Sequence, residues 1–178
     1  MGWLTRKAIS LATVTQDLKS YSAPPDDSPS SPPVSHIVTQ QTATGGIKGT
    51  TEHRTLDWTV RSHTDYLFGE LQAKSRWSTL ELVKKGAKEA AAGEKEEWYE
   101  GDAEYLTEGW GEESKDGEVV ESWARNAKAG WTGWQVWGFE VLNKENGEGE
   151  RWLVRRFAIR KGEKVERARL VYTWAGEN

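Results

Sequence analysis

The distribution of proline and tryptophan constrains the fold of this chain more than any other feature of its sequence. All five prolines fall between Pro24 and Pro33, whereas ten of the eleven tryptophans fall between Trp58 and Trp174. Proline has no amide hydrogen to give to a sheet ladder, so a long proline-free stretch is compatible with continuous strands. Tryptophan is favoured in strands and buries a large apolar area. The pattern predicts a compact β domain that follows a Pro/Ser-rich segment.

This division predicts two parts, an N-terminal arm over residues 1–35 and a β domain over residues 36–178. Four apolar residues of the arm fall at helical spacing and predict a short amphipathic helix within residues 3–21: Leu4, Leu11, Val14 and Leu18. The segment Ser22–Ser35 holds every proline, so we expect it to be an extended, flexible linker.

From His36 onward the sequence alternates between apolar and polar residues, as half-buried strands do. Asp116-Gly117 and Asn146-Gly147 are favoured hairpin turns. We therefore predict an all-β fold, an antiparallel up-and-down barrel of the lipocalin or calycin type with about eight strands. The Ala/Glu/Lys-rich segment Lys84–Glu104 interrupts the pattern, and we interpret it as a solvated insertion loop or a mobile lid. The expected strands are His36–Thr44, Glu52–Val60, Tyr66–Trp77, Tyr105–Glu113, Glu118–Asn126, Trp131–Asn143, Arg151–Lys161 and Lys164–Trp174.

Charge and cysteine content narrow the classes of function. The formal net charge is −4, which disfavours nucleic acid and anionic membranes as partners. The chain has no cysteine, which favours a reducing compartment, so we expect a cytoplasmic location. The histidines show no recognised metal-ligand spacing, and no phosphate-binding loop is present, so we expect neither a metal nor a cofactor. The sequence does not indicate the oligomeric state.

The alternation also predicts which side chains point inward. Arg155 shares its face with Leu153 and Phe157, and Glu108 shares its face with Leu106 and Trp110. A buried charge is costly unless it is paired, so these residues either form internal salt bridges in a filled barrel or line a cavity. In the second interpretation Glu108 and Arg155 are the candidate catalytic residues. The candidate ligand-binding residues are Arg54, Trp58, Trp77, Trp110, Trp123, Gln135, Trp137, Phe139 and Tyr172.

Two segments carry a resemblance to known proteins, TATGGIKGTTEHRTLDW (Thr42–Trp58) and GWTGWQVWGFE (Gly130–Glu140). They resemble uncharacterised small fungal proteins of the lipocalin-like or calycin-like type. The resemblance covers about residues 36–174 and implies a β-barrel with a central pocket for a hydrophobic small molecule. Some fungal lipocalin-like barrels act as cyclases or isomerases in secondary metabolism.

Three hypotheses of function remain open from the sequence. The first is a binding protein that encloses a small hydrophobic organic molecule, which in one version is acidic and pairs with Arg155 or Arg54. The second is an isomerase, cyclase or dehydratase that needs no cofactor. In that enzyme Glu108 is the acid/base, with a pKa raised by an apolar cavity, and Arg155 stabilises developing negative charge. The third is a filled barrel that acts through its surface as an interaction protein.

Overall fold

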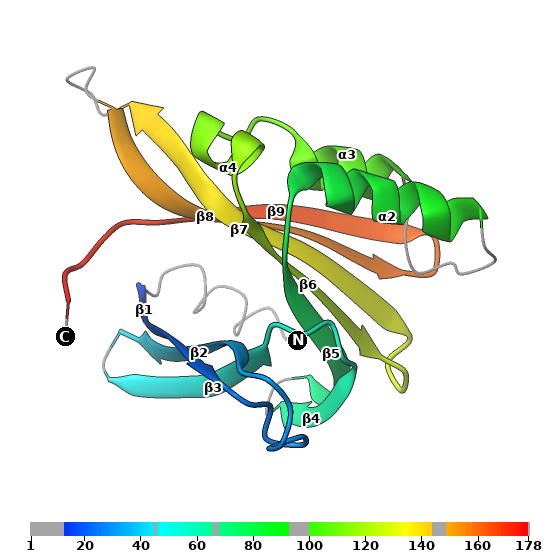
Figure 1. Ribbon diagram of the computed structural model, residues 1–178. Helices are drawn as coiled ribbons and strands as arrows, with labels where there is room; N and C mark the ends of the chain where they lie inside the picture. Colours follow the sequence, from blue (N-terminus) through cyan, green and yellow to red (C-terminus); the bar gives the residue numbers. More distant parts are fainter. Residues whose placement is uncertain (1–12, 45, 66–67, 93–99, 144–148, 178) are drawn as a thin grey trace.

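The strands of this protein form two antiparallel sheets (Figure 1). The computed structural model describes residues 13–44, 46–65, 68–92, 100–143 and 149–177. The smaller sheet contains β1 (Val14–Ala23), β2 (Val34–Ala43) and β3 (Ile47–Thr55). The larger sheet contains, in chain order, β4 (Arg61–Asp65), β5 (Gly69–Ser78), β6 (Val119–Asn126), β7 (Trp131–Asn143), β8 (Gly149–Lys161) and β9 (Lys164–Tyr172).

This arrangement confirms the predicted antiparallel β fold and corrects the predicted barrel. Each strand of the larger sheet pairs with its neighbour in the sequence, as expected for successive hairpins. Within the described residues, however, the nine strands divide into a sheet of three and a sheet of six and do not close into one barrel. The chain leaves the smaller sheet after β3 at Trp58, whose φ of 61° breaks the extended backbone. The structure therefore has two sheets with separate edges where the sequence predicted one barrel.

Three helices lie on one face of the larger sheet: α2 (Leu80–Ala92), α3 (Glu100–Thr107) and α4 (Glu112–Asp116) (Figure 1). Helix α2 begins after Thr79, whose Oγ1 accepts a hydrogen bond from the Leu82 amide at 3.2 Å, as N-cap residues do. The helices bury a core against β6, β7 and β8 that consists of Leu80, Val83, Ala103, Leu106, Trp110, Val119, Trp134, Val136, Val154 and Ala158.

The helices correct two predictions. The segment Lys84–Glu104, interpreted as a loop, contributes to α2 and α3, and α2 has 13 residues. The predicted strand Tyr105–Glu113 is wrong, because its first residues end α3 and its last residues begin α4. Leu106 and Trp110 are four residues apart, and this spacing fits one face of a strand as well as one face of a helix. The Trp110 Nε1–H donates to the Leu106 carbonyl at 2.8 Å, which fixes the indole under α3.

The N-terminal region also differs from its prediction. Val14–Ala23 form β1 and pair with β2 along their whole length, so the predicted helix is wrong for Val14–Tyr21, and residues 1–12 lie outside the described residues. The Pro/Ser segment is the connection of this hairpin and contains two turns, closed by bonds from the Ser28 amide to Pro25 and from the Ser31 amide to Ser28. A boundary between residues 35 and 36 would cut through β2.

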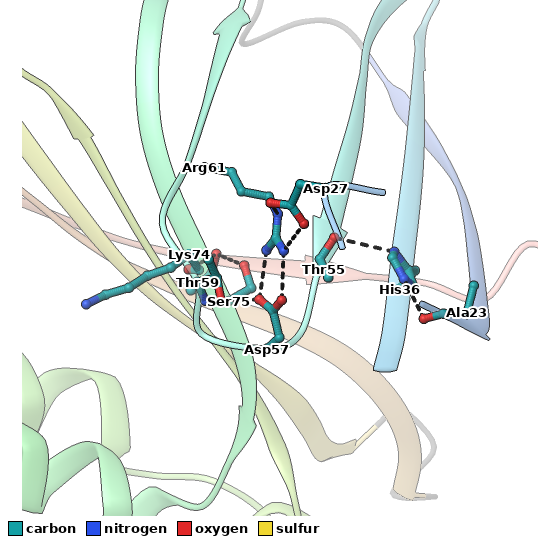
Figure 2. A network of polar contacts seen from close by, with 10 residues as sticks. Ala23, Asp27, His36, Thr55, Asp57, Thr59, Arg61, Lys74 and Ser75 are labelled. Carbon is teal, nitrogen blue, oxygen red and sulfur yellow. Dashed lines mark hydrogen bonds and ion pairs between the residues drawn. The ribbon is translucent and has the colours of Figure 1, made fainter. Parts of the chain in front are cut away.

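An arginine joins this hairpin connection to the larger sheet (Figure 2). The Arg61 guanidinium, at the start of β4, donates hydrogen bonds of 2.7–2.9 Å to both carboxylate oxygens of Asp57 and both of Asp27. The Arg61 hydrogen bond holds the pKa of Asp57 at about 2, well below its usual value. Arg61 therefore connects the β1–β2 turn, the segment after β3 and the larger sheet.

Candidate functional site

The larger sheet presents its second face to the smaller sheet. Ile37 and Leu56 pack there against Val120 and Trp137, and this buried cluster joins the two sheets. The pairing register places five side chains of this face in one row across the sheet, from β5 to β9. Side chains opposite one another on paired strands are in contact range, so the row acts as one surface. The row consists of Trp77, Val120, Trp137, Arg155 and Leu170.

Arg155 is the charged member of this row, and it is buried. Its side chain is 4% exposed, and its Nη2 donates a 2.9 Å hydrogen bond to Gln135 Oε1. The same Gln135 oxygen accepts a 2.8 Å bond from Trp137 Nε1, so one amide holds both the guanidinium and the indole. The Arg155 guanidinium lies 4.0 Å from the Trp137 ring centre and 5.1 Å from that of Phe157, within cation–π range.

Among the described residues, no carboxylate forms an ion pair with Arg155, and its Nε has no hydrogen-bond partner. Burial lowers the pKa of Arg155, and Arg54 lowers it further, whereas Tyr172 and Glu52 oppose the shift. Burying a cation without a counter-ion costs free energy. A buried donor that retains an unused hydrogen is suited to bind an oxygen of a ligand.

The smaller sheet places a second arginine, Arg54, near the Trp137 indole. Arg54 of β3 lies 4.8 Å from the Trp137 ring centre and pairs with Glu52, two residues earlier on the same face. Thr39 of β2 also points to this side, is fully buried, and has an Oγ1 without a hydrogen-bond partner in the described residues. Polar groups of both sheets therefore gather around Trp137.

Apolar side chains extend from this polar group along the two facing sheet surfaces, and several remain partly open to solvent. Leu170 of β9 and Leu18 of β1 are each 44% exposed. The neighbouring rows add half-buried side chains on β8 and β9, which are Leu153, Phe157 and Tyr172. The site thus combines apolar walls, a buried indole and a buried cation; we call it the intersheet site, defined by Arg54, Gln135, Trp137, Arg155, Leu170 and Tyr172.

The structure brings together some of the predicted site residues and separates others. The alternation correctly predicted that Gln135, Trp137, Phe139, Arg155 and Tyr172 share a face, and Trp77 and Arg54 face the same side. Phe139 lies at the end of this face, under the Arg151 guanidinium at 3.3 Å. Whether these residues bind a ligand stays a prediction.

Four predicted residues lie elsewhere. Glu108 follows α3 and is exposed, so it does not share a face with Arg155 as the sequence predicted, and its role as an acid/base stays a prediction. Trp110 fills the core under the helices at 2% exposure. Trp123 and Trp58 lie on the helix side of β5 and β6, where Lys74 approaches both rings, at 5.3 and 4.6 Å from their centres.

Sequence reasoning missed Glu52 and Thr39. Glu52 lies two residues before Arg54, which the alternation placed on the inner face, and Thr39 lies two residues after the buried Ile37, so a period of two in the sequence marks both positions. In the described part of the chain, no group of three or more His, Asp or Glu side chains is placed to hold a metal ion. No helix among the described residues is long and apolar enough to cross a membrane.

The fold and this site define a class of protein, a two-sheet antiparallel β protein with an apolar surface and a buried guanidinium between its sheets. Two fungal proteins are similar to the chain over almost its full length. "Pericyclase pydY" from Acremonium sp. is 27% identical over 176 residues, covering 99% of this chain and 80% of that protein. "Probable pericyclase scpY" from Mollisia scopiformis is 27% identical over 174 residues, covering 98% and 77%. No family model and no solved structure matches the chain.

Proposed function

We propose that this protein is an enzyme that closes a ring in an unsaturated, largely apolar secondary metabolite by a pericyclic reaction at the intersheet site. The observation that carries the proposal is the full-length similarity to two proteins that are named pericyclases. The proposal therefore takes up the cyclase alternative of the sequence analysis in preference to a simple binding protein.

The composition of the site agrees with this chemistry. In a pericyclic reaction the bonds form and break in one cyclic array of electrons, so the enzyme has no proton to move. Its contribution is to hold the chain in the folded conformation that reacts and to polarise a conjugated carbonyl. The buried Trp137 and the surrounding Leu153, Phe157 and Leu170 offer a shaped apolar surface, and Arg155 offers a fixed donor. Glu108 lies outside the intersheet site, so the competing isomerase or dehydratase scheme, in which Glu108 moves a proton beside Arg155, has less support.

A linear triene provides the test. Deca-2,7,9-trienoic acid and its methyl ester close to bicyclic products of the same mass by an intramolecular cycloaddition that is slow without a catalyst. We expect the protein to accelerate closure of at least one of them and to favour one stereoisomer, measured by chiral chromatography. Acceleration by unfolded protein, or no acceleration of either compound by folded protein, would contradict the proposal and return the choice to a binding protein.

Two leucines give a matched pair for locating the reaction. Leu170 in the intersheet site is 44% exposed, and Leu82 on the helix side of the sheet is 46% exposed. Each can be shortened to alanine at similar cost in stability, because each is already partly hydrated. We expect Leu170→Ala to change the rate and the isomer ratio, and Leu82→Ala to change neither. The reverse result would place the reaction on the helix side.

A further inference from the structure

We infer that the ligand of the intersheet site is an organic anion, a conjugated chain that ends in a carboxylate or enolate, and that Arg155 pairs with its oxygen. This inference rests on the proposed function for the location of the site and adds the charge of the substrate. Its basis is the difference between Arg155 and the other buried charges of the molecule.

The other buried charged side chains of the described residues all have partners of opposite sign. Glu140 accepts hydrogen bonds from Arg156 and Arg169, and Asp102 from Arg160 and Arg167. Glu121 accepts bonds from Arg76 at 2.7 Å and from the Trp134 indole at 3.2 Å. Each of these buried carboxylates is therefore paired with at least one arginine. Arg155 is buried as well, but it has no such partner of opposite charge among the described residues.

The surroundings of Arg155 show where the compensating charge belongs. Its described polar partners are neutral, the Gln135 amide and the Tyr172 hydroxyl. Glu52, the carboxylate of the facing strand, is bound to Arg54 instead. Among the described residues, the Arg54 and Arg155 guanidinium groups and the Glu52 carboxylate thus lie near Trp137, which leaves one net positive charge in a largely apolar site. An anionic oxygen at Arg155 would neutralise it and form a charge-assisted hydrogen bond.

The polarity of the site also sets the orientation of the ligand. Arg155 lies in the middle of β8, beside the cluster of Ile37, Leu56 and Val120 that joins the sheets. The partly open apolar residues Leu170 and Leu18 lie on the outer strands β9 and β1. The acidic end of the ligand therefore lies against Trp137 and Arg155, and its hydrocarbon part lies along β8 and β9.

Binding of trans-parinaric acid and of its methyl ester tests this inference without a turnover assay. The compound is a conjugated tetraene whose absorption overlaps tryptophan emission, so energy transfer from the protein's tryptophans, Trp137 among them, reports binding. We expect the wild-type protein to bind the acid about 10- to 100-fold more tightly than the ester, the range given by one charge-assisted hydrogen bond. Arg155→Gln should remove this preference by weakening binding of the acid far more than binding of the ester.

Two further variants separate the role of Arg155 from general charge effects. Arg151→Gln removes an exposed guanidinium from the same face of β8, and it should keep the preference for the acid. Glu52→Gln removes the neighbouring carboxylate, and it should increase the preference for the acid. Because this second effect is a gain, failure of a variant to fold cannot imitate it.

The outcomes distinguish this inference from the proposed function. Equal binding of acid and ester by the wild-type protein, a preference that survives Arg155→Gln, or no binding of either compound by folded protein would overturn the inference. A protein that accelerates triene closure but binds acid and ester alike would retain the proposed function and refute the anionic ligand. A protein with an Arg155-dependent preference for the acid that closes neither triene would retain the inference and refute the enzyme.

Discussion

The two faces of the larger sheet differ in whether their buried charged side chains have partners of opposite charge. On the face under the helices, Glu121, Glu140 and Asp102 are each bound by arginine, and an aliphatic and aromatic core fills the space between them. On the face toward β1–β3, the buried charge is Arg155, held by a neutral amide. A paired charge stabilises the fold only as long as both partners remain, whereas an uncompensated charge reduces stability and is retained for another reason. The comparison indicates that the helix face contributes most to stability, and it agrees with the proposal that a ligand binds on the opposite face.

The largest expected effect separates these two faces directly. Glu140→Gln leaves Arg156, 11% exposed, without its buried counter-ion, so the free energy of unfolding should fall by about 3–5 kcal/mol. Arg155→Gln removes an uncompensated charge, so the change should stay below about 1 kcal/mol in either direction. Urea unfolding followed by tryptophan fluorescence measures both values. Equal losses in the two variants would show that Arg155 has a structural role and would remove the contrast between the faces.

Two glycines of β7 compare packing on the two faces. A Cβ at Gly138 would lie 2.6 Å from Ser114 Oγ and 2.9 Å from Trp110 Cζ3, because α4 and the Trp110 indole press on the strand there. A Cβ at Gly133, on the opposite face, would make only ordinary contacts of 3.5 Å or more. We expect Gly138→Ala to cost about 1–3 kcal/mol through overpacking and Gly133→Ala to cost less than about 0.5 kcal/mol. Thermal unfolding of the pair tests this, and a tolerated alanine at position 138 would contradict the tight helix face.

The connection between the sheets should respond to pH. The pKa of Asp57 is about 2 because Arg61 donates hydrogen bonds to it, compared with 3.8 for a free side chain. The lowered pKa adds stability that is present above about pH 4 and is lost as the pH falls toward 2. Allowing for solvent screening, we expect this contribution to be on the order of 1–2 kcal/mol.

Acid titration of stability can isolate this contribution. In Asp57→Asn, the free energy of unfolding should fall less between pH 4 and 2 than in the wild type. Asp26→Asn, which removes an exposed carboxylate of the same β1–β2 turn, should keep the wild-type slope. If both variants follow the wild-type curve, the Arg61 connection does not stabilise the joint between the sheets.

The smallest effect concerns an ion pair at the surface. Glu113 and Arg151 are about half exposed and lie 2.7 Å apart, in contrast to the buried Glu140 pair. Exposed pairs gain little because water screens both charges, so Glu113→Gln should change the free energy of unfolding by less than about 0.5 kcal/mol. A loss comparable to that of Glu140→Gln would show that burial does not govern the strength of these pairs.

The period-two pattern of residues 131–172 determined much of the candidate site from the sequence alone. A strand directs alternate side chains to opposite faces, so the alternation in β7, β8 and β9 was sufficient to place Gln135, Trp137, Arg155 and Tyr172 on one surface. The same alternation in β3 placed Arg54 on the inner face. It also places Glu52, two residues before Arg54, on that face, although the sequence analysis did not select Glu52. Strand direction and pairing of neighbours also followed, because short turns join antiparallel strands.

Tertiary structure decided the remaining features. Leu106 and Trp110 have a spacing that serves a strand or a helix, and packing against Val83 and Val154 selected the helix, which moved Glu108 away from Arg155. The separation into two sheets depends on the backbone break at Trp58, and local alternation does not report such a break. The pairing of buried charges also depends on contacts between distant segments. Asp102, for example, accepts a hydrogen bond from Arg167, which is 65 residues away in the sequence. The sequence therefore set the faces of the strands, and the assembly of distant segments decided which face the helices cover and which face packs against the smaller sheet.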